Sequence, residues 1–350
     1  MTGKAPKKGN MSMNKKTILS IVAWLLALLC CLFLLDQAMR RDDGKRKYGP
    51  FFAEKNNFDV LFMGSSHVLD GVQPMELWRD YGYATYNMGF SSESMEMTEW
   101  VLRLALEYNK PKMAIIDTYY VNRSIDAAWA FKFRHAFLDE IPLSRSKFEA
   151  VRATLPKSEW LEFLMPFSLY HGRWEEILTG NVERIVDCEP YMMGSELRPG
   201  SCRDRQEDMD VIAQYRRTTE MNMENMPGKD ALRRIVALCR ENGVEPVFMA
   251  IPGPVSEEEQ MNMNSIHLIA QELGVPYIDM FEEEGLLVWA DDCYDYLGHL
   301  NPSGSSKVTA YLGRWLSENA QLSDKRGRED YRHWDENLAL YEAHRARVWD

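Results

Sequence analysis

The sequence predicts an α/β protein in which a parallel β-sheet is covered by helices on both faces. Short apolar runs end in small or polar residues, and amphipathic helical patterns lie between these runs. Such β-rich runs, alternating with helices, are typical of parallel strands that are buried on both faces. One longer apolar segment near the N-terminus lies outside the alternating pattern and calls for a separate explanation.

The N-terminal apolar segment predicts a membrane anchor. Residues 17–35 are nineteen in number and carry no charge, and as a helix they span about 28 Å, close to the hydrocarbon thickness of a bilayer. A cleaved signal peptide has a shorter apolar core and a small-residue cleavage site. We therefore expect a cytoplasmic tail at residues 1–16, an uncleaved transmembrane anchor at 17–36 and a body outside the cytoplasm. Five Lys precede the segment and five Lys or Arg follow it before residue 48, so the charge rule alone is nearly balanced.

The charge distribution argues against general nucleic-acid binding. The first 47 residues carry a net charge of +7 and the remaining 303 carry −19, which gives −12 in total. A body this acidic lacks the Lys/Arg surface that neutralises phosphates. Six Cys in 350 residues are also too few for a scaffold built on disulfides.

Five apolar runs follow a polar, basic segment at residues 37–57, which we expect to be a juxtamembrane linker. Ligands of open parallel sheets bind beyond the carboxyl ends of the strands. Small or polar residues such as Gly64, Gly89 and Asp117 stand at those ends here. The predicted strands are residues 60–63, 83–87, 113–116, 246–251 and 275–279.

Helical patterns at residues 93–107, 229–240 and 265–273 separate the predicted strands. The second pattern ends at Asn242-Gly243 and the third at Gly274, which is typical of helix C-termini.

We expect the domain to comprise residues 58–320. An insertion within it and the segment that follows it do not fit the alternating pattern. Residues 124–228, approximately, break the alternation and predict an insertion that forms a lid over the site. Residues 321–350 are highly charged with scattered aromatic side chains, and they predict a C-terminal helix packed on the body.

The sequence Gly64-Ser65-Ser66-His67 directly follows the first predicted strand and is a candidate nucleophile turn. Gly64 permits a sharp turn of the backbone, and the N-terminus of a following helix stabilises developing negative charge. A serine is a poor nucleophile unless a base takes its proton. A serine at this position can instead cap the helix, so the turn alone leaves both roles open.

A candidate base stands in a loop after the last predicted strand. His299 follows Asp295 and precedes Leu-Asn301 and an amphipathic helix at about 306–316. A histidine can take a proton from a serine while an aspartate holds its tautomer and stabilises the imidazolium.

Together, these motifs resemble those of the SGNH (GDSL-type) hydrolase superfamily. The resemblance rests on the Gly-x-Ser turn, the glycine after the second strand and the His-Leu-Asn-x-x-Gly element before the last helix. More narrowly, the anchor with FDVLFMGSSHV and GHLNPSGSSKVTAYL resembles bacterial membrane-anchored members, including DltD-like proteins. The resemblance implies a flavodoxin-like three-layer α/β/α sandwich and Ser–His–Asp acyl chemistry.

The resemblance also implies roles for individual residues. Ser66 corresponds to the nucleophile and His299 to the base, and the backbone N–H groups of Ser66 and Gly89 correspond to the oxyanion hole. Ser65 stands where the family usually has Asp, and its hydroxyl is expected to serve the turn. His67, next to the nucleophile, is expected to be structural.

Two departures from the family pattern leave alternatives open. The family's Asp stands three residues before the His, where this chain has Tyr296, so Asp295 is the first choice and Asp292 the second. The family's Gly-x-Asn-Asp block is absent, and Asn122 or Tyr119 are candidates for the third oxyanion donor that its Asn gives.

The remaining Cys and His residues predict neither a metal site nor another cofactor. No Cys/His cluster has metal-ligand spacing and no Gly-rich phosphate loop occurs in the sequence. Cys188 and Cys202 are fourteen residues apart and could form a disulfide if the insertion is extracellular.

Two functions are compatible with these observations. The first is a membrane-anchored serine esterase or O-acyltransferase that acts on a cell-envelope glycan or teichoic acid. The resemblance to DltD-like proteins implies a membrane-bound O-acyltransferase as partner. The second is a catalytically weak or inactive protein of the same fold that serves an envelope acylation complex as a scaffold or binder.

Overall fold

The computed structural model describes residues 14–39, 43–122, 135, 138–179 and 188–349. The chain divides into two compact units. The smaller comprises Met1–Arg40 and Met165–Val182, and the larger comprises Arg41–Leu164 and Glu183–Asp350.

The larger unit is built on one parallel sheet. Its strands are β1 (Val60–Gly64), β2 (Thr85–Gly89), β3 (Met113–Asp117), β4 (Glu245–Ala250) and β5 (Tyr277–Asp279). They follow the order β2-β1-β3-β4-β5, and every pair is parallel. This order is flavodoxin-like, so the predicted α/β class is confirmed. The carboxyl ends of β1, β2 and β3 meet at one edge of the sheet.

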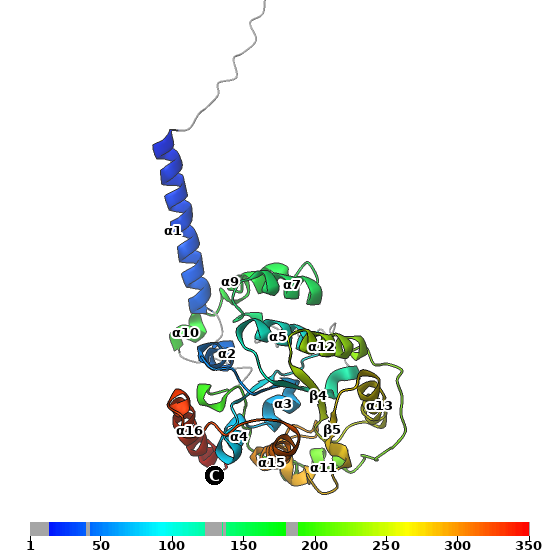
Figure 1. Cartoon of the computed structure of the whole chain (residues 1–350). Helices are drawn as coiled ribbons and strands as arrows, with labels where there is room; N and C mark the ends of the chain where they lie inside the picture. The colour runs from blue at the N-terminus through cyan, green and yellow to red at the C-terminus, as the bar shows by residue number, and fades with distance from the viewer. Residues whose placement is uncertain (1–13, 40–42, 123–134, 136–137, 180–187, 350) are drawn as a thin grey trace, which may run out of the picture. The chain divides into compact units, whose positions relative to one another are not determined.

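Helices cover both faces of this sheet. They are α3 (Ser66–Gly71), α4 (Pro74–Tyr81), α5 (Met95–Tyr108), α12 (Lys229–Glu241), α13 (Glu257–Leu273) and α15 (Pro302–Asn319). Successive side chains of a strand point to opposite faces. Leu61 and Met63 of β1 therefore enter the core that α5 and α12 cover, whereas Val60 and Phe62 enter the core that α15 covers. Figure 1 shows these helices on opposite sides of the sheet, as the predicted three-layer sandwich requires.

Residues 37–57 are not simply a linker, contrary to the expectation from their composition. Helix α2 (Asp43–Ala53) lies there, and its Tyr48 and Phe51 are buried in the core of the larger unit. The ammonium group of Lys47 is buried as well and donates to the carbonyl oxygens of Asn87 and Gly194. The segment is rich in basic residues, so its composition suggested a solvated linker although it forms an amphipathic helix.

The insertion between β3 and α12 is mainly helical where the structure describes it. Residues 123–134, 136–137 and 180–187 of this region lie outside the described residues, and its expected role as a lid remains a prediction. Its elements are η1 (Tyr119–Asn122), α7 (Arg145–Thr154), α8 (Trp160–Leu164), α9 (Phe167–Tyr170), α10 (Trp174–Thr179), η3 (Pro190–Met192), η4 (Cys202–Asp204) and α11 (Gln206–Ile212).

The smaller unit contains a long apolar helix, α1 (Lys15–Met39). Within the described part of the chain, it is the helix that is long and apolar enough to cross a membrane. A signal sequence near an N-terminus has the same properties. Helix α9 and Arg173, the residue before α10, contact its C-terminal end. The N–H of Phe167 donates to Oδ1 of Asp36 over 2.7 Å, and Nη1 of Arg173 donates to the carbonyl of Met39 over 2.9 Å.

The C-terminal segment ends in a helix that packs on the larger unit. Helix α16 (Arg332–Trp349) follows η6 (Glu329–Tyr331). Its Trp334 is fully buried, with ring centroids 5.1 Å from Trp78 and 6.1 Å from Phe58. The indole N–H donates to Glu54 over 2.9 Å, so both the apolar and the polar part of this side chain are satisfied.

Replacing Trp334 by Ala should lower the free energy of unfolding by about 3–5 kcal/mol, because it removes a buried aromatic side chain and leaves a cavity. Leu340→Ala is the matched control on the same helix, since Leu340 is 52% exposed and its loss should cost about 0.5 kcal/mol or less. Urea unfolding followed by circular dichroism measures both. Equal, small losses would contradict the placement of α16 in the core.

Candidate active site

The turn after β1 is fixed by close packing against the end of β3. Gly64 has φ +144°, and a Cβ there would lie 2.7 Å from Cβ of Asp117, so only glycine fits. Ser65 is the N-cap of α3, where its Oγ accepts the N–H of His67 over 3.3 Å. The same hydroxyl donates to Oδ2 of Asp117 over 3.2 Å. Ser65 therefore serves the turn, and the helix begins at Ser66.

Hydrogen bonds connect Ser66 to His299 and His299 to Asp295. Oγ of Ser66 is 2.7 Å from Nε2 of His299, and Nδ1 of His299 is 2.7 Å from Oδ2 of Asp295. Ser66 is buried, with 6% of its surface exposed. We refer to these three residues as the candidate triad.

The loop of residues 293–300, here called the histidine loop, explains how an Asp four residues before the His reaches it. Cys293 and Leu300 form an antiparallel bridge, which closes the loop. Oδ1 of Asp295 accepts the backbone N–H groups of Leu297 at 3.0 Å and His299 at 3.3 Å. One carboxylate oxygen thus shapes the loop, and the other is left for the imidazole.

Asp292, the alternative third member, is engaged elsewhere. Its side chain is fully buried and forms an ion pair with Nζ of Lys307 at 2.6 Å. It also accepts the hydroxyl of Ser303 at 2.8 Å and the N–H of Val288 at 2.7 Å. It joins helix α14 (Trp289–Asp292) to the start of α15.

Asn301 anchors the histidine loop to the following helix. Its Oδ1 caps α15 by accepting the N–H groups of Ser303 and Gly304. Its Nδ2 donates to the carbonyls of Gly200 and Asp291. The His-x-Asn pattern in the sequence therefore combines a candidate base with the cap of the last sheet-flanking helix.

The environment of His299 favours its protonated form. Burial opposes this, but the hydrogen bond to Asp295 and the charge of Asp70 outweigh burial and raise the pKa of His299 above its ordinary value. Burial acts against ionisation of Asp295 too, but the hydrogen bond from His299 lowers the pKa of Asp295 overall. Such a pairing stabilises the imidazolium that would form when a serine loses its proton.

A cluster of polar side chains around Tyr294 and Asp70 lies beside His299 and was not expected from the sequence. The ring of Tyr294 stacks on that of His299 with centroids 5.4 Å apart, and its hydroxyl donates to Asp70 over 3.0 Å. Burial, followed by the charge of Glu196, raises the pKa of Asp70 to about 7. Arg198 pairs with Glu196 at 3.0 Å and lies over the ring of Tyr294. Only the spacing of Asp70, one helical turn after Ser66, signals this group in the sequence.

His67 links the turn to the histidine loop. Its Nε2 donates to the carbonyl of Leu297 over 3.0 Å, because a carbonyl can only accept. Its ring stacks on Tyr119 with centroids 3.7 Å apart. Burial, followed by the charge of His299, lowers the pKa of His67 to about 3, so this imidazole stays neutral and acts as a fixed tie.

The expected oxyanion hole is only partly available. Ser66 is the first residue of α3, so its N–H has no acceptor within the helix. The N–H of Gly89, however, donates to Oδ1 of Asn87 over 2.9 Å. Gly89 packs tightly on the turn, since a Cβ there would lie 2.7 Å from the carbonyl oxygen of Ser65.

The candidates for a third donor lie in η1. The ring of Tyr119 stacks on His67, and its role as a donor remains a prediction. Among the residues that the structure describes, the buried Oδ1 of Asn122 has no hydrogen-bond partner, and the assignment of Asn122 to the oxyanion hole remains a prediction.

In the described part of the chain, one group of His, Asp and Glu side chains outside the candidate triad lies close enough together to be considered as metal ligands. His267, Asp279 and Glu282 bring one ligand atom each within 4.8 Å of one another. His267 already bonds Asp279 at 2.9 Å, and the other oxygen of Asp279 accepts the N–H of Phe281 in η5 (Met280–Glu282). These bonds join His267 to the residue that caps η5.

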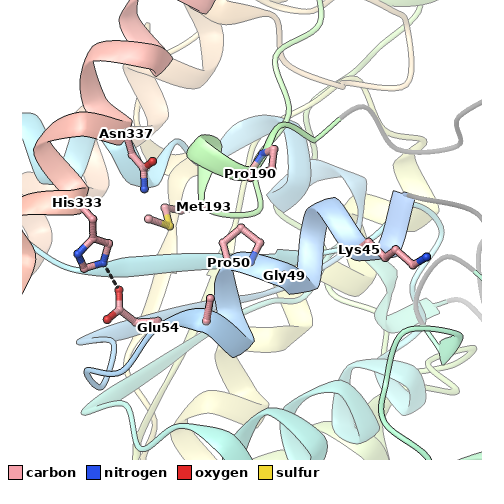
Figure 2. Close-up of a pocket in the computed structure, with 9 residues that line it drawn as sticks. Lys45, Gly49, Pro50, Glu54, Pro190, Met193, His333 and Asn337 are labelled. Carbon is pink, nitrogen blue, oxygen red and sulfur yellow. Dashed lines mark hydrogen bonds and ion pairs between the residues drawn. The ribbon is translucent and has the colours of Figure 1, made fainter. Parts of the chain in front are cut away.

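A cavity of about 360 Å³ lies between α2, η3 and α16. Figure 2 shows the hydrogen-bonded pair His333 and Glu54 on its wall, 2.8 Å apart. Among the described residues, its lining contains no serine or cysteine. The residues that line it are Lys45, Gly49, Pro50, Ala53, Glu54, Pro190, Met193, His333 and Asn337.

The disulfide between Cys188 and Cys202 that their spacing allowed is not formed. Both cysteines are free and buried. Sγ of Cys188 donates instead to the carbonyl of Gly194 over 3.5 Å, and this carbonyl also accepts from Lys47.

Comparisons with known proteins provide a distant structural likeness. No family model and no curated protein matches the chain. Among solved structures, the chain is similar to a crystal structure described as that of "a putative acylhydrolase" from Bacteroides fragilis, with 10% sequence identity and a TM-score of 0.37. The alignment covers 78% of this chain and 95% of that chain. At this identity the likeness concerns the fold alone.

Replacing Ser65 should lower the free energy of unfolding more than replacing the adjacent Ser66. Ser65→Ala removes both the helix cap and the bond to Asp117, and it should lower the free energy of unfolding by about 1–2 kcal/mol. Ser66→Ala removes no cap and should cost about half of that or less. Urea unfolding of both variants measures the difference, and a larger loss for Ser66→Ala would contradict the assignment of the cap.

The pH dependence of Ser66 reactivity should report the raised pKa of His299. A base must be neutral to accept a proton, so a raised pKa moves the acid limb of the rate profile to higher pH. We expect a midpoint above about 6.5, the ordinary value for histidine. Asp70→Asn should move the midpoint down, because the charge of Asp70 favours the imidazolium. The measurement is the rate of labelling by a fluorophosphonate across the pH range, with the exposed Asp230→Asn as the control. An unchanged midpoint in Asp70→Asn would contradict this electrostatic account.

Proposed function

We propose that the chain is a serine-dependent acyl-transfer enzyme of SGNH type, an esterase or O-acyltransferase. The observation that carries the proposal is the contact sequence Ser66–His299–Asp295, with 2.7 Å at each step. This geometry matches the requirement that nucleophile, base and orienting carboxylate lie within hydrogen-bond reach.

In the proposed reaction, Oγ of Ser66 attacks the carbonyl carbon of an ester while His299 takes its proton. The tetrahedral intermediate collapses, the bond to the leaving alcohol breaks, and His299 returns the proton to that alcohol. Water or a sugar hydroxyl then attacks the acyl-serine, with His299 again as base, and Ser66 is regenerated. Asp295 stays ionised throughout and stabilises the imidazolium.

The proposed setting is the outer face of a cell membrane. Helix α1 supports anchoring by its length and apolar composition, and the resemblance to DltD-like proteins supports an envelope glycan or teichoic acid as substrate. The same resemblance supports a membrane-bound O-acyltransferase as partner, which would supply the acyl group. Hydrolysis and transfer differ in this scheme only by the acceptor.

A second candidate function is that of a catalytically weak or inactive scaffold in an envelope acylation complex. The observation that favours it is the occupied N–H of Gly89, which donates to Asn87. Each oxyanion donor is typically worth about 3 kcal/mol to the transition state, so a site left with the N–H of Ser66 would react slowly.

A fluorophosphonate probe distinguishes the two functions. The detergent-solubilised full chain should be labelled at Ser66, and Ser66→Ala and His299→Ala should lose the label. Ser317→Ala, which removes an exposed hydroxyl on α15, is the matched control and should label like the unchanged chain. Absence of labelling in a folded, unchanged chain would contradict the enzyme and favour the scaffold. Equal labelling of Ser66→Ala would contradict the nucleophile.

A further inference from the structure

Two buried cysteines far apart in the sequence are direct neighbours in the structure. Cys202 opens η4 in the insertion, and Cys293 opens the histidine loop, 91 residues later. Both side chains are fully buried. The backbone N–H of Cys202 donates to the carbonyl of Cys293 over 2.9 Å, so the two chain segments touch at these residues.

Contacts of the residues that flank Cys202 fix this register. The hydroxyl of Ser201 donates to the carbonyl of Ala290 over 2.8 Å. The guanidinium of Arg203 binds the carboxylate of Asp291 in a bidentate ion pair. A shift by one residue would break both contacts, so Cys202 and Cys293 remain opposite one another.

The separation set by this pairing suits a disulfide. A single backbone N–H···O=C bond between two residues holds their Cα atoms roughly 5–6 Å apart by covalent geometry, within the roughly 4.4–6.8 Å that disulfides span. Both side chains enter the same apolar core, together with Leu300 and Val308. They therefore point to the same side of the paired backbones.

Cys202 and Cys293 are both free thiols in this structure, and we propose that they form a disulfide in the mature protein, which ties the insertion covalently to the histidine loop. The proposal rests on the proposed placement of the body outside the cytoplasm, where disulfides persist. In the reaction the two thiols lose two protons and two electrons as the S–S bond forms. The electron acceptor is the disulfide of an envelope thiol–disulfide oxidoreductase, which becomes a dithiol.

The chemistry of the two thiols places this step during folding. Burial, followed by the charge of Asp208, raises the pKa of Cys202 to about 11, and burial and the neighbouring Cys202 raise the pKa of Cys293. Thiolates are the reactive form, so the thiols react slowly once they are buried. The bond must form before the core closes, and reductant reaches it again only when the chain unfolds.

The other cysteines of the chain have different surroundings. Cys188 bonds to the carbonyl of Gly194, and Cys239 of α12 lies in the core on the opposite face of the sheet. Cys30 and Cys31 lie in α1, which belongs to the smaller unit.

The disulfide should stabilise the loop that carries two members of the candidate triad. Cys293 stands two residues before Asp295 and six before His299. We expect reductant to lower the Tm of the unfolding transition by on the order of 5–10 °C, because the bond closes a long loop. Cys202→Ser and Cys293→Ser should each abolish this dependence on reductant, whereas Cys188→Ser should retain it.

Mass spectrometry of the full chain tests the bond directly. The chain is isolated from the envelope of an expressing cell without reductant, denatured in an alkylating reagent and digested. We expect a peptide pair linked through Cys202 and Cys293, with Cys188 and Cys239 alkylated. The linked pair should be absent from Cys293→Ser and present in Cys188→Ser.

A topology reporter separates failure of this inference from failure of the proposed location. Glu284 is 89% exposed, and a membrane-impermeant maleimide should label Glu284→Cys on intact cells. If it does, and both Cys202 and Cys293 are alkylated without reductant, the disulfide is overturned while the location stands.

If the reporter is not labelled, the location is overturned, and refolding decides the pairing by itself. The reduced, denatured chain is refolded in a glutathione redox buffer. A bond between Cys202 and Cys293 supports the inference, and any other pair, or free thiols, overturns it.

Discussion

The close approach of β1 and β3 at their carboxyl ends is the constraint on which the candidate site depends. Gly64 has no room for a side chain because Asp117 lies against it, and the backbone must therefore turn sharply there. Ser65 holds this turn by capping α3 and bonding to Asp117. Because Ser65 caps the helix, the hydroxyl of Ser66 is available to contact His299 in the histidine loop.

Three separate contacts hold the histidine loop in place. His67 bonds to Leu297 from the turn, Tyr294 bonds to Asp70 from α3, and Asn301 fixes the loop to α15. Two of these contacts come from α3 and the third from α15, so His299 is positioned by two helices rather than by one neighbour. Asp295 then completes the arrangement by bonding both the backbone of its own loop and the imidazole. Preorganisation of this kind is what acyl-transfer chemistry requires of its groups.

The sequence allowed the sheet, its flanking helices and the nearness of Ser66 to His299 to be predicted, because strand ends in a parallel sheet converge. It could not decide between Asp295 and Asp292, since both stand at plausible spacings. The decision depends on the ion pair of Asp292 with Lys307, a contact to the next helix. The occupied N–H of Gly89 was equally hidden, because it depends on the side-chain orientation of Asn87. Helix α2 was missed because its buried lysine made the segment look like a solvated linker.

The most direct test of the account compares Asp295→Asn with Asp292→Asn in the hydrolysis of a p-nitrophenyl ester by the full chain. If Asp295 orients His299, Asp295→Asn should lower kcat by on the order of 10³–10⁴ with little loss of stability. Asp292→Asn should lower the Tm, because it leaves Lys307 without its partner, but should change kcat by less than about tenfold where the chain is folded. An unchanged rate in Asp295→Asn, or an equal loss in both variants, would contradict the candidate triad.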